Sequence, residues 1–463
     1  MLNTRVYVDR RAVLKSQFKS GVALFLGNIE SPMNYSANTF PFRQDSTFLY
    51  YLGLDSAGLA AIVDFDKGTE TVFGDDITVE DIVWMGPQTP LAERCREVGV
   101  GSVRPSADLE TVLADALADH RQVHFLPPYR PENVIKIQHL LGIHAAKAKQ
   151  YASVDLIRAV AAQRSVKAAE EIEQIEQALE ITREMHLTAM RMTRPGLKES
   201  DIAGAIEGVA LSREVHVAFP VILTVHGETL HNPFHGNLLK EGGMVLNDSG
   251  AESKLHYAAD ITRTFPVTGL FTPQQRTLYQ IILDAQEAAL QAMKPGKRFL
   301  DVHLLACLTL AKGLKEMKLM RGDLDEAVRA GAHALFFQCG LGHMMGLDVH
   351  DMEDIGEAYV GYDETVQRNK QFGICYLRMA KALQPGYVMT VEPGLYFIPA
   401  LIDQWKSENR HAEFINYKEV DHFRQIGGLR VEDDVLVTND GIRMLGEPIP
   451  KTIDEMETAM SGD

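Results

Sequence analysis

Two apolar segments of this chain each contain an aspartate at a position that a strand would bury. Met244–Leu246 leads into the first strand, Ser253-Lys254-Leu255 forms the tip and Tyr257–Val267 forms the returning strand, which predicts a β-hairpin. If the turn is centred on Lys254, Asp248 and Asp260 face each other across the ladder, where opposed Cβ atoms lie about 5 Å apart. Two carboxylates held this close repel each other unless a proton or a cation lies between them. An exposed pair would be solvated instead, but the apolar flanks of both strands disfavour that interpretation.

Two later segments repeat this arrangement. Tyr387–Glu392 is apolar up to its final carboxylate, and Pro393-Gly394 ends it. The segment GGLRVEDDVLVT alternates, so that Arg430, Glu432 and Asp434 share one face of a predicted strand. A single acidic residue in a strand usually marks its solvated side. The apolar strand and the rigid turn around the first of these carboxylates disfavour that interpretation here.

Histidines supply a third element. His343 and His350 lie in CGLGHMMGLDVHD, where glycines allow close backbone approach, and His231 follows the apolar run Val221–Val225. Four carboxylates with at least one imidazole and no thiolate form an oxygen-rich set, which suits Mn²⁺ better than a structural Zn²⁺. Such a set can hold two ions about 3.5–4 Å apart, and the residue types alone leave the number of ions open.

Several other functional classes lack their motifs. The chain has no HExxH helix and no GxSxG elbow, and GLGHMMG does not match the GxGxxG dinucleotide fingerprint. The 463 residues carry a net charge of −17 without a basic run, which disfavours nucleic-acid partners. We expect no membrane association and a cytoplasmic location, because no apolar run reaches the length of a membrane span or a signal peptide. The four separated cysteines are interpreted as reduced thiols.

Strands and helices alternate in the N-terminal part of the chain, which predicts an α/β domain over residues 1–155. The predicted strands there include Leu59–Asp64, Glu70–Phe73 and Gln122–Leu126. A long charged helix over Ala168–Met192 then opens a second, larger domain, which we expect to span residues 156–463.

These motifs, in this order, resemble those of the Xaa-Pro metallopeptidases of the pita-bread family (prolidase and aminopeptidase P) over nearly the whole chain. The resemblance implies an N-terminal creatinase/prolidase-type α/β domain followed by a larger pita-bread (α+β) catalytic domain. It also implies two divalent metal ions per chain, with Mn²⁺ favoured. Five side chains match the family's metal ligands: Asp248, Asp260, His343, Glu392 and Glu432.

The same resemblance implies a role for each of these ligands. Asp248 would bind one ion and His343 the other. Asp260 and Glu432 would bridge the two ions. Glu392 would bind the second ion and pass a proton toward the leaving proline nitrogen.

Further matches concern the substrate and the assembly. His350 and His231 would hydrogen-bond the scissile carbonyl, and Arg430 would orient Glu432 from outside the metal's own ligands. Arg378 matches the arginine that grips the substrate's carboxylate in prolidases. Trp84 matches a tryptophan that reaches into a partner subunit's site, which implies a homodimer.

We therefore favour an Xaa-Pro dipeptidase, with an Xaa-Pro aminopeptidase acting on longer peptides as the alternative. A non-catalytic peptide-binding module and a metal-free, creatinase-like hydrolase are more remote, because all five ligand positions are kept. The chain departs from the family pattern at two places. The spacing from Asp248 to Asp260 is one residue longer than usual, which bears on the hairpin tip and not on the ligands. Cys339 stands where the family usually has a histidine, and we expect it to change packing or a substrate contact without loss of metal.

Overall fold

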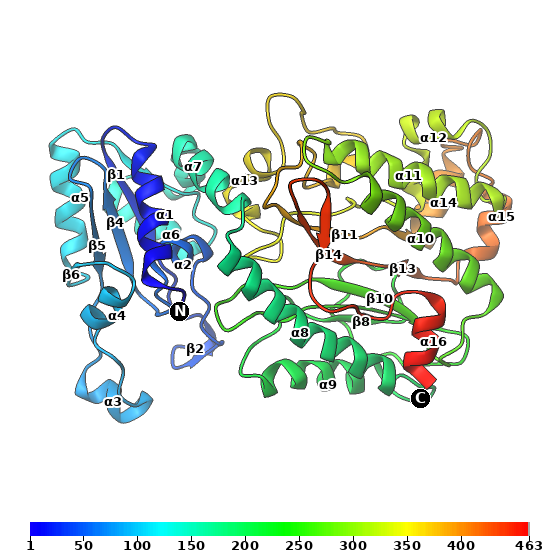
Figure 1. Ribbon diagram of the computed structural model, residues 1–463, viewed down its shortest axis with the longest axis horizontal. Coiled ribbons are helices and arrows are strands. Elements are labelled where there is room, and N and C mark those ends of the chain that lie inside the picture. The colour runs from blue at the N-terminus through cyan, green and yellow to red at the C-terminus, as the bar shows by residue number, and fades with distance from the viewer. Residues whose placement is uncertain (462–463) are drawn as a thin grey trace. The chain divides into compact units, whose positions relative to one another are not determined.

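The computed structural model describes residues 1–461, which divide into two compact units (Figure 1). The first unit comprises Met1–Arg164 together with Met352–Val360. The second unit comprises Ser165–Asp351 and the chain from Gly361 onward. Each unit combines helices with strands, in agreement with the predicted two-domain α/β organisation.

The first unit is built on a mixed five-stranded sheet with the strand order β6-β5-β4-β1-β7. Its strands are β1 (Val22–Leu26), β4 (Ala60–Asp64), β5 (Thr69–Phe73), β6 (Ser102–Arg104) and β7 (Val123–Phe125), and β2 (Pro32–Tyr35) and β3 (Asn38–Thr39) form a separate small hairpin. β1 pairs antiparallel with β4 and parallel with β7. β4, β5 and β7 confirm the three strands predicted in this region. The apolar run Ala60–Val63 fits the complete burial of β4, which ends at Asp64.

Helices complete the first unit. They are α1 (Thr4–Ser16), α2 (Ser46–Leu52), α3 (Val79–Met85), α4 (Leu91–Glu97), α5 (Asp108–Ala118), α6 (Pro131–Leu141), α7 (Val154–Ser165), α13 (Glu353–Val360) and the 3₁₀ helix η1 (Ala145–Tyr151). Leu109 and Leu113 of α5 and Ile137 of α6 pack with the sheet in one hydrophobic core. Ile157 of α7 joins the same core, which is why this unit extends beyond the boundary expected at residue 155.

Three small sheets form the strand framework of the second unit. They consist of β8 (Ile222–Thr224), β9 (Met244–Ser249) and β10 (Ile261–Pro266); of β11 (Val388–Val391), β14 (Asp433–Val437) and β15 (Ile442–Met444); and of β12 (Gly394–Tyr396) and β13 (Gly428–Arg430). A bridge between Thr262 and Glu432 joins the first of these sheets to the segment between β13 and β14. A second bridge, between Met344 and Met389, attaches a loop to β11.

Two pairs of long helices flank this framework (Figure 1). α8 (Ala169–Met192) packs against α9 (Glu199–Ser212) and contacts β9 and β10, whereas α10 (Pro273–Ala292) packs against α11 (Phe299–Glu316) and contacts β11, β12 and β13. The remaining helices are α12 (Leu324–Ala330), η2 (Ala332–Leu335), η3 (Ile374–Tyr376), α14 (Pro399–Ser407), α15 (Tyr417–Val420), η4 (Asp421–Phe423) and α16 (Ile453–Ser461). α8 confirms the predicted long helix, and Ile175 and Leu179 of its apolar face are buried.

The predicted hairpin forms between β9 and β10, but its register differs from the prediction. Asp248 pairs with Thr262, so Asp260 lies diagonally from Asp248 instead of directly opposite. The turn is closed between Ser253 and Tyr257, which moves the tip one residue past the predicted centre. Because alternate residues of a strand point to the same face, the two aspartates still share one face.

None of the helices over residues 1–461 combines the length and the apolarity that crossing a membrane requires. The four cysteines are free thiols, in agreement with the predicted reduced state. Cys95 in the first unit and Cys307 in the second are buried.

Candidate metal centre and substrate pocket

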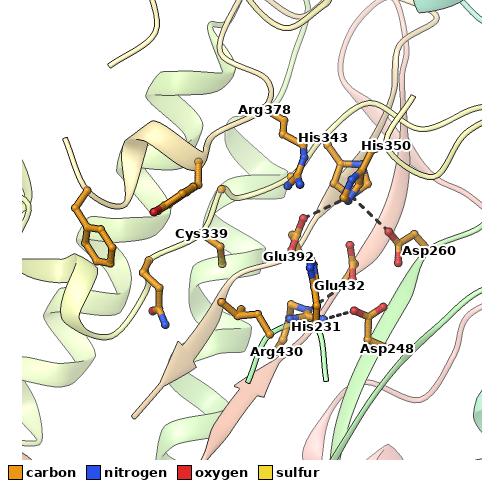
Figure 2. A pocket seen from close by; sticks show the side chains of 16 residues that line it. His231, Asp248, Asp260, Cys339, His343, His350, Arg378, Glu392, Arg430 and Glu432 are labelled. Carbon is orange, nitrogen blue, oxygen red and sulfur yellow. Dashed lines mark hydrogen bonds and ion pairs between the residues drawn. The ribbon is translucent and has the colours of Figure 1, made fainter. Parts of the chain in front are cut away.

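The five predicted metal ligands come from separate segments of the second unit and line one pocket (Figure 2). Asp248 lies in β9, and Asp260 directly precedes β10. Glu392 directly follows β11, and Glu432 lies between β13 and β14. His343 lies in the loop that the bridge to β11 holds in place. We refer to these five residues as the acidic cluster.

The His343 ring lies close to carboxylates of the acidic cluster. Its Nε2 lies 3.4 Å from Asp260 Oδ2 and 3.6 Å from Glu392 Oε1. Ligand atoms of Asp260, His343 and Glu432 all lie within 4.8 Å of one another. His343 Nδ1 lies 3.1 Å from the carbonyl oxygen of Met344, a contact that fixes the ring with Nε2 toward the carboxylates. These separations place oxygen and nitrogen donors within reach of a shared cation.

Backbone contacts with β11 position the His343 loop. The amide of Thr390 donates to the carbonyl of His343 over 3.0 Å, and the amide of His343 donates to the Thr390 hydroxyl over 3.1 Å. The amide of Glu392 donates to the carbonyl of Leu341 over 2.8 Å. A Cβ at Gly342 would lie 2.0 Å from the carbonyl oxygen of Thr390, so only glycine allows this approach.

Burial determines the electrostatics of the acidic cluster. Asp248 and Asp260 are 7% and 5% exposed, and burial raises the pKa of each to about 7. Burial also raises the pKa of Glu392 and, more strongly, that of Glu432, and the neighbouring carboxylates add to both shifts. The carboxylates therefore favour protons in the absence of another positive charge. A divalent cation can take the place of these protons.

Arg430 is a buried cation beside the acidic cluster. Its guanidinium pairs with the carboxylate of Asp248, and its Nε lies 3.8 Å from Glu432 Oε2. It also donates to the hydroxyls of Thr262, at 2.9 Å, and Tyr396, at 3.0 Å. The predicted contact with Glu432 is therefore present, and the closer ion pair is with Asp248. One guanidinium balances only part of the charge of four carboxylates.

The donor set of the acidic cluster fits a divalent metal. Oδ1 of Asp248 and Oδ1 of Asp260 are buried and have no hydrogen-bond partner within the described residues. Buried oxygens without a partner are unfavourable, and a cation at this position would satisfy them. Carboxylate oxygens with one imidazole nitrogen suit hard or borderline divalent ions such as Mn²⁺.

The pocket around the acidic cluster has a volume of about 380 Å³. His231, His350 and Arg378 line it, as the sequence predicts for side chains that face a substrate (Figure 2). The rings of His343 and His350 meet edge to face with their centroids 4.4 Å apart. Trp84, which was predicted to reach a partner subunit's site, lies on α3 of the first unit and is 81% exposed.

A family model described as Metallopeptidase family M24 matches residues 173–439, which is more than half of the chain. The chain belongs to metallopeptidase family M24. A second model, described as Aminopeptidase P, N-terminal domain, matches residues 7–124. The two matches confirm the predicted resemblance to Xaa-Pro metallopeptidases and the predicted order of the two domains.

Individual proteins resemble this M24 metallopeptidase over nearly its full length. It is 30% identical to a human Xaa-Pro dipeptidase, covering 96% of this chain and 90% of that protein. It is 29% identical to a probable Xaa-Pro aminopeptidase of Uncinocarpus reesii, covering 95% and 89% of the two chains. The solved structure of zinc-substituted Escherichia coli aminopeptidase P with product is 27% identical, with a TM-score of 0.82 and coverage of 100% of this chain and 99% of that chain.

Some residues in the pocket of this M24 metallopeptidase, and one buried beside it, were given no role in the sequence analysis. Asp434 accepts a hydrogen bond from the amide of Asp260 over 3.1 Å, and burial raises its pKa well above the usual value. Its alternation with Glu432 was a visible signal that it shares the buried face. Phe372 and Tyr376 line the pocket; Phe372 lies in a turn and Tyr376 in the short helix η3, and neither segment is long enough for periodicity to indicate a direction.

Proposed function

We propose that this M24 metallopeptidase hydrolyses Xaa-Pro peptide bonds with two divalent cations, and that Mn²⁺ is the cation it uses. The observation that carries the proposal is the convergence of three buried carboxylates, the partly buried carboxylate of Glu392 and one imidazole in a single pocket. The names of the relatives, Xaa-Pro dipeptidase and Xaa-Pro aminopeptidase, support the choice of bond. An Xaa-Pro bond has no amide N–H and a restricted backbone, so its hydrolysis calls for a dedicated site.

In the proposed centre Asp248 would help to hold one cation and His343 the other. Asp260 and Glu432 would contribute carboxylates to both cations, and Glu392 would contribute its carboxylate to the second. The contact of Arg430 with Oδ2 of Asp248 supports this assignment, because it leaves Oδ1 as the oxygen that faces a metal.

The side chains around the cations carry out the proton transfers and the binding steps. When bound, two such cations lower the pKa of a water molecule and polarise the scissile carbonyl. Glu392 would accept a proton and deliver it to the leaving proline nitrogen. His350 and His231 donate hydrogen bonds to the carbonyl oxygen as it gains charge, each worth about 3–4 kcal/mol.

We further propose that dipeptides are the preferred substrates. Arg378 lines the pocket, and its guanidinium would pair with the carboxylate that directly follows proline in a dipeptide. An Xaa-Pro aminopeptidase acting on longer peptides is the second candidate. The likeness to a probable Xaa-Pro aminopeptidase and to aminopeptidase P structures supports it.

Metal content after reconstitution with Mn²⁺ tests the proposed centre. We expect about two Mn²⁺ per chain, and we expect Asp260→Ala to lose both the bound Mn²⁺ and the hydrolysis of an Xaa-Pro dipeptide. Asp284→Ala, at an exposed position on α10, is the matched control and should keep both. A folded wild-type chain that takes up no Mn²⁺ would contradict the proposal.

A parallel assay of an Xaa-Pro dipeptide and an Xaa-Pro-Yaa tripeptide tests the substrate length. We expect the dipeptide to be preferred, and we expect Arg378→Gln to raise KM for the dipeptide about 10–100-fold, because a charge-assisted contact contributes about 1.5–3 kcal/mol. The tripeptide should respond little to this substitution. Preference of the wild-type enzyme for the tripeptide would favour the aminopeptidase.

We also propose a homodimer in which α3 contacts the partner subunit. Val79, Val83 and Trp84 are 79%, 75% and 81% exposed, an unusual amount of apolar surface for one short helix. Sedimentation should show a dimer that Trp84→Ser shifts toward the monomer, and a monomeric wild-type chain would contradict the proposal. The proposed compartment is the cytoplasm, where the free cysteines would stay reduced.

A further inference from the structure

A second group of metal-binding side chains lies in the core of the second unit, outside the acidic cluster. His303 and Cys307 lie four residues apart on α11 and therefore share one face of the helix. His333 of η2 lies against them, and one ligand atom from each of the three residues lies within 4.8 Å of the others. His303 and Cys307 are 0% exposed and His333 is 2% exposed. We refer to these three residues as the thiol cluster.

The spacing within the thiol cluster matches that of two ligands of one ion. Sγ of Cys307 lies 3.5 Å from Nε2 of His303. In a tetrahedral zinc site, a Zn–S bond of about 2.3 Å and a Zn–N bond of about 2.0–2.1 Å place sulfur and nitrogen about 3.5 Å apart. The two side chains on α11 therefore need little movement to share a metal.

Hydrogen bonding alone does not account for the thiol cluster. A thiol proton donated to Nε2 of His303 explains one contact. It leaves Nδ1 of His303 and both ring nitrogens of His333 without a hydrogen bond to any described residue. The carbonyl of Val328 is close enough to raise the pKa of His333, but it makes no hydrogen bond of normal geometry. Buried nitrogens without a partner are unfavourable, and a shared cation would bind one nitrogen of each ring.

The protonation states of the cluster also suit a metal. Burial lowers the pKa of His303 to about 3 and that of His333 to about 4, so both rings are neutral, which is the form that binds metal. Burial raises the pKa of the Cys307 thiol, so binding of a cation would release its proton.

We propose that His303, Cys307 and His333 bind one Zn²⁺ in a structural site that is separate from the acidic cluster. Thiolate and imidazole ligands favour Zn²⁺ over a hard cation such as Mn²⁺. The ion links α11 to η2, and the chain continues from η2 to Gln338 and Cys339, which line the substrate pocket. The bound Zn²⁺ therefore holds one wall of the pocket in place.

Cobalt binding tests this site in the intact chain, because a thiolate ligand gives Co²⁺ a near-ultraviolet charge-transfer absorption that oxygen and nitrogen ligands do not. Co²⁺ in the acidic cluster, which contains no thiolate, does not produce this signal. We expect the wild-type chain to develop the absorption up to one equivalent of thiolate-bound Co²⁺. Addition of Zn²⁺ should remove it.

Variants assign the signal to the thiol cluster. We expect Cys307→Ser to abolish the absorption and His333→Gln to weaken Co²⁺ binding at least about tenfold. Cys375→Ser is the matched control and should keep the signal, because Cys375 lies outside the cluster. Cys339→Ser should also keep it, since the absorption comes from Cys307. Circular dichroism of each metal-free variant checks that it is folded.

Two results would overturn the proposal. The first is a folded wild-type chain that shows no thiolate absorption with Co²⁺. The second is an absorption that persists in Cys307→Ser and disappears in Cys339→Ser, which would place the reactive thiolate in the substrate pocket. If Cys307→Ser does not fold, the wild-type titration together with His333→Gln still decides the question.

Discussion

The acidic cluster lies at strand ends beside a pocket, whereas the thiol cluster lies between α11 and η2 in the core. Burial shifts the pKa values of the two clusters in opposite directions. It raises the pKa of Asp248 and Asp260 to about 7, and it lowers that of His303 to about 3 and that of His333 to about 4. Without a metal, the acidic cluster therefore has to hold protons or repelling charges, and the thiol cluster is neutral. We therefore expect the acidic cluster to depend on bound cations, and the thiol cluster to fold without a metal and to gain stability from one.

Substitution of Glu392 should give the largest effect and should separate the two clusters. We expect Glu392→Gln to lower kcat for an Xaa-Pro dipeptide about 10²–10⁴-fold, because the amide cannot accept the proton. The thiolate absorption of bound Co²⁺ should not change. Near-wild-type kcat in this variant would remove Glu392 from its proposed role, and a loss of the absorption would show that the clusters are coupled.

Removal of Arg430 should destabilise the metal-free protein more than any change in the thiol cluster. At pH 8, where Asp248 is ionised, Arg430→Met leaves its buried carboxylate without an ion pair, and we expect a loss of about 3–5 kcal/mol in the free energy of unfolding. Arg213→Gln, which removes an exposed ion pair with Glu184, should have little effect.

Trp405 provides the measurement for this prediction. The chain has two tryptophans, so in a Trp84→Phe background the buried Trp405 reports urea unfolding of the second unit alone. Equal loss of stability in Arg430→Met and Arg213→Gln would mean that the acidic cluster does not depend on the guanidinium.

The pH dependence of stability should differ in sign between the two clusters. The folded pKa of His333, about 4, lies below its unfolded value of about 6.5. Its contribution is therefore complete above pH 6.5 and is lost as the pH falls toward 4, by up to about 3 kcal/mol. In metal-free protein, His333→Gln should reduce this loss of stability at low pH. His139→Gln, at an exposed position, should not. An unchanged acid loss in His333→Gln would mean that the ring is not buried in its neutral form.

Asp248 and Asp260 provide the opposite case. Their folded pKa of about 7 lies above the unfolded value of about 3.9, so their contribution is complete below pH 3.9 and is lost as the pH rises through 7. Relative to the metal-free wild-type chain, Asp260→Asn should lose less stability between pH 5 and pH 8. Addition of Mn²⁺ to the wild-type chain should remove the same loss, because the cation replaces the protons.

The apolar or alternating strands around them singled out the four carboxylates of the acidic cluster, and the resemblance to Xaa-Pro metallopeptidases selected these carboxylates and His343 as the ligand set. The predicted register of the hairpin was wrong because the turn centre was taken at Lys254. A shift of the tip by one residue moves the cross-strand partner of Asp248 by two residues. The alternation of the strands kept both aspartates on one face despite this error. Pocket residues such as Phe372 could not be predicted, since irregular segments have no periodic pattern of apolar residues.

The thiol cluster shows a second limit. The spacing of His303 and Cys307 at i and i+4 on a helix is visible in the sequence. Without a CxxC pair, however, the cysteines gave no indication of a metal. His333 follows α12, and only the packing of η2 against α11 brings it to the other two ligands.

The smallest effect should come from the thiol cluster in the absence of metal. Cys307 and Cys95 are both 0% exposed, so Cys307→Ala and Cys95→Ala should each cost about 1 kcal/mol in metal-free protein. Zn²⁺ at about 100 times its dissociation constant should stabilise the wild-type chain and Cys95→Ala by about 2.7 kcal/mol, but not Cys307→Ala. Calorimetry in EDTA and in Zn²⁺ measures both quantities. If Cys307→Ala is already less stable than Cys95→Ala in EDTA, the thiol contributes mainly through its hydrogen bond to His303. If the two variants differ in stability only with Zn²⁺, the metal is the source of the difference.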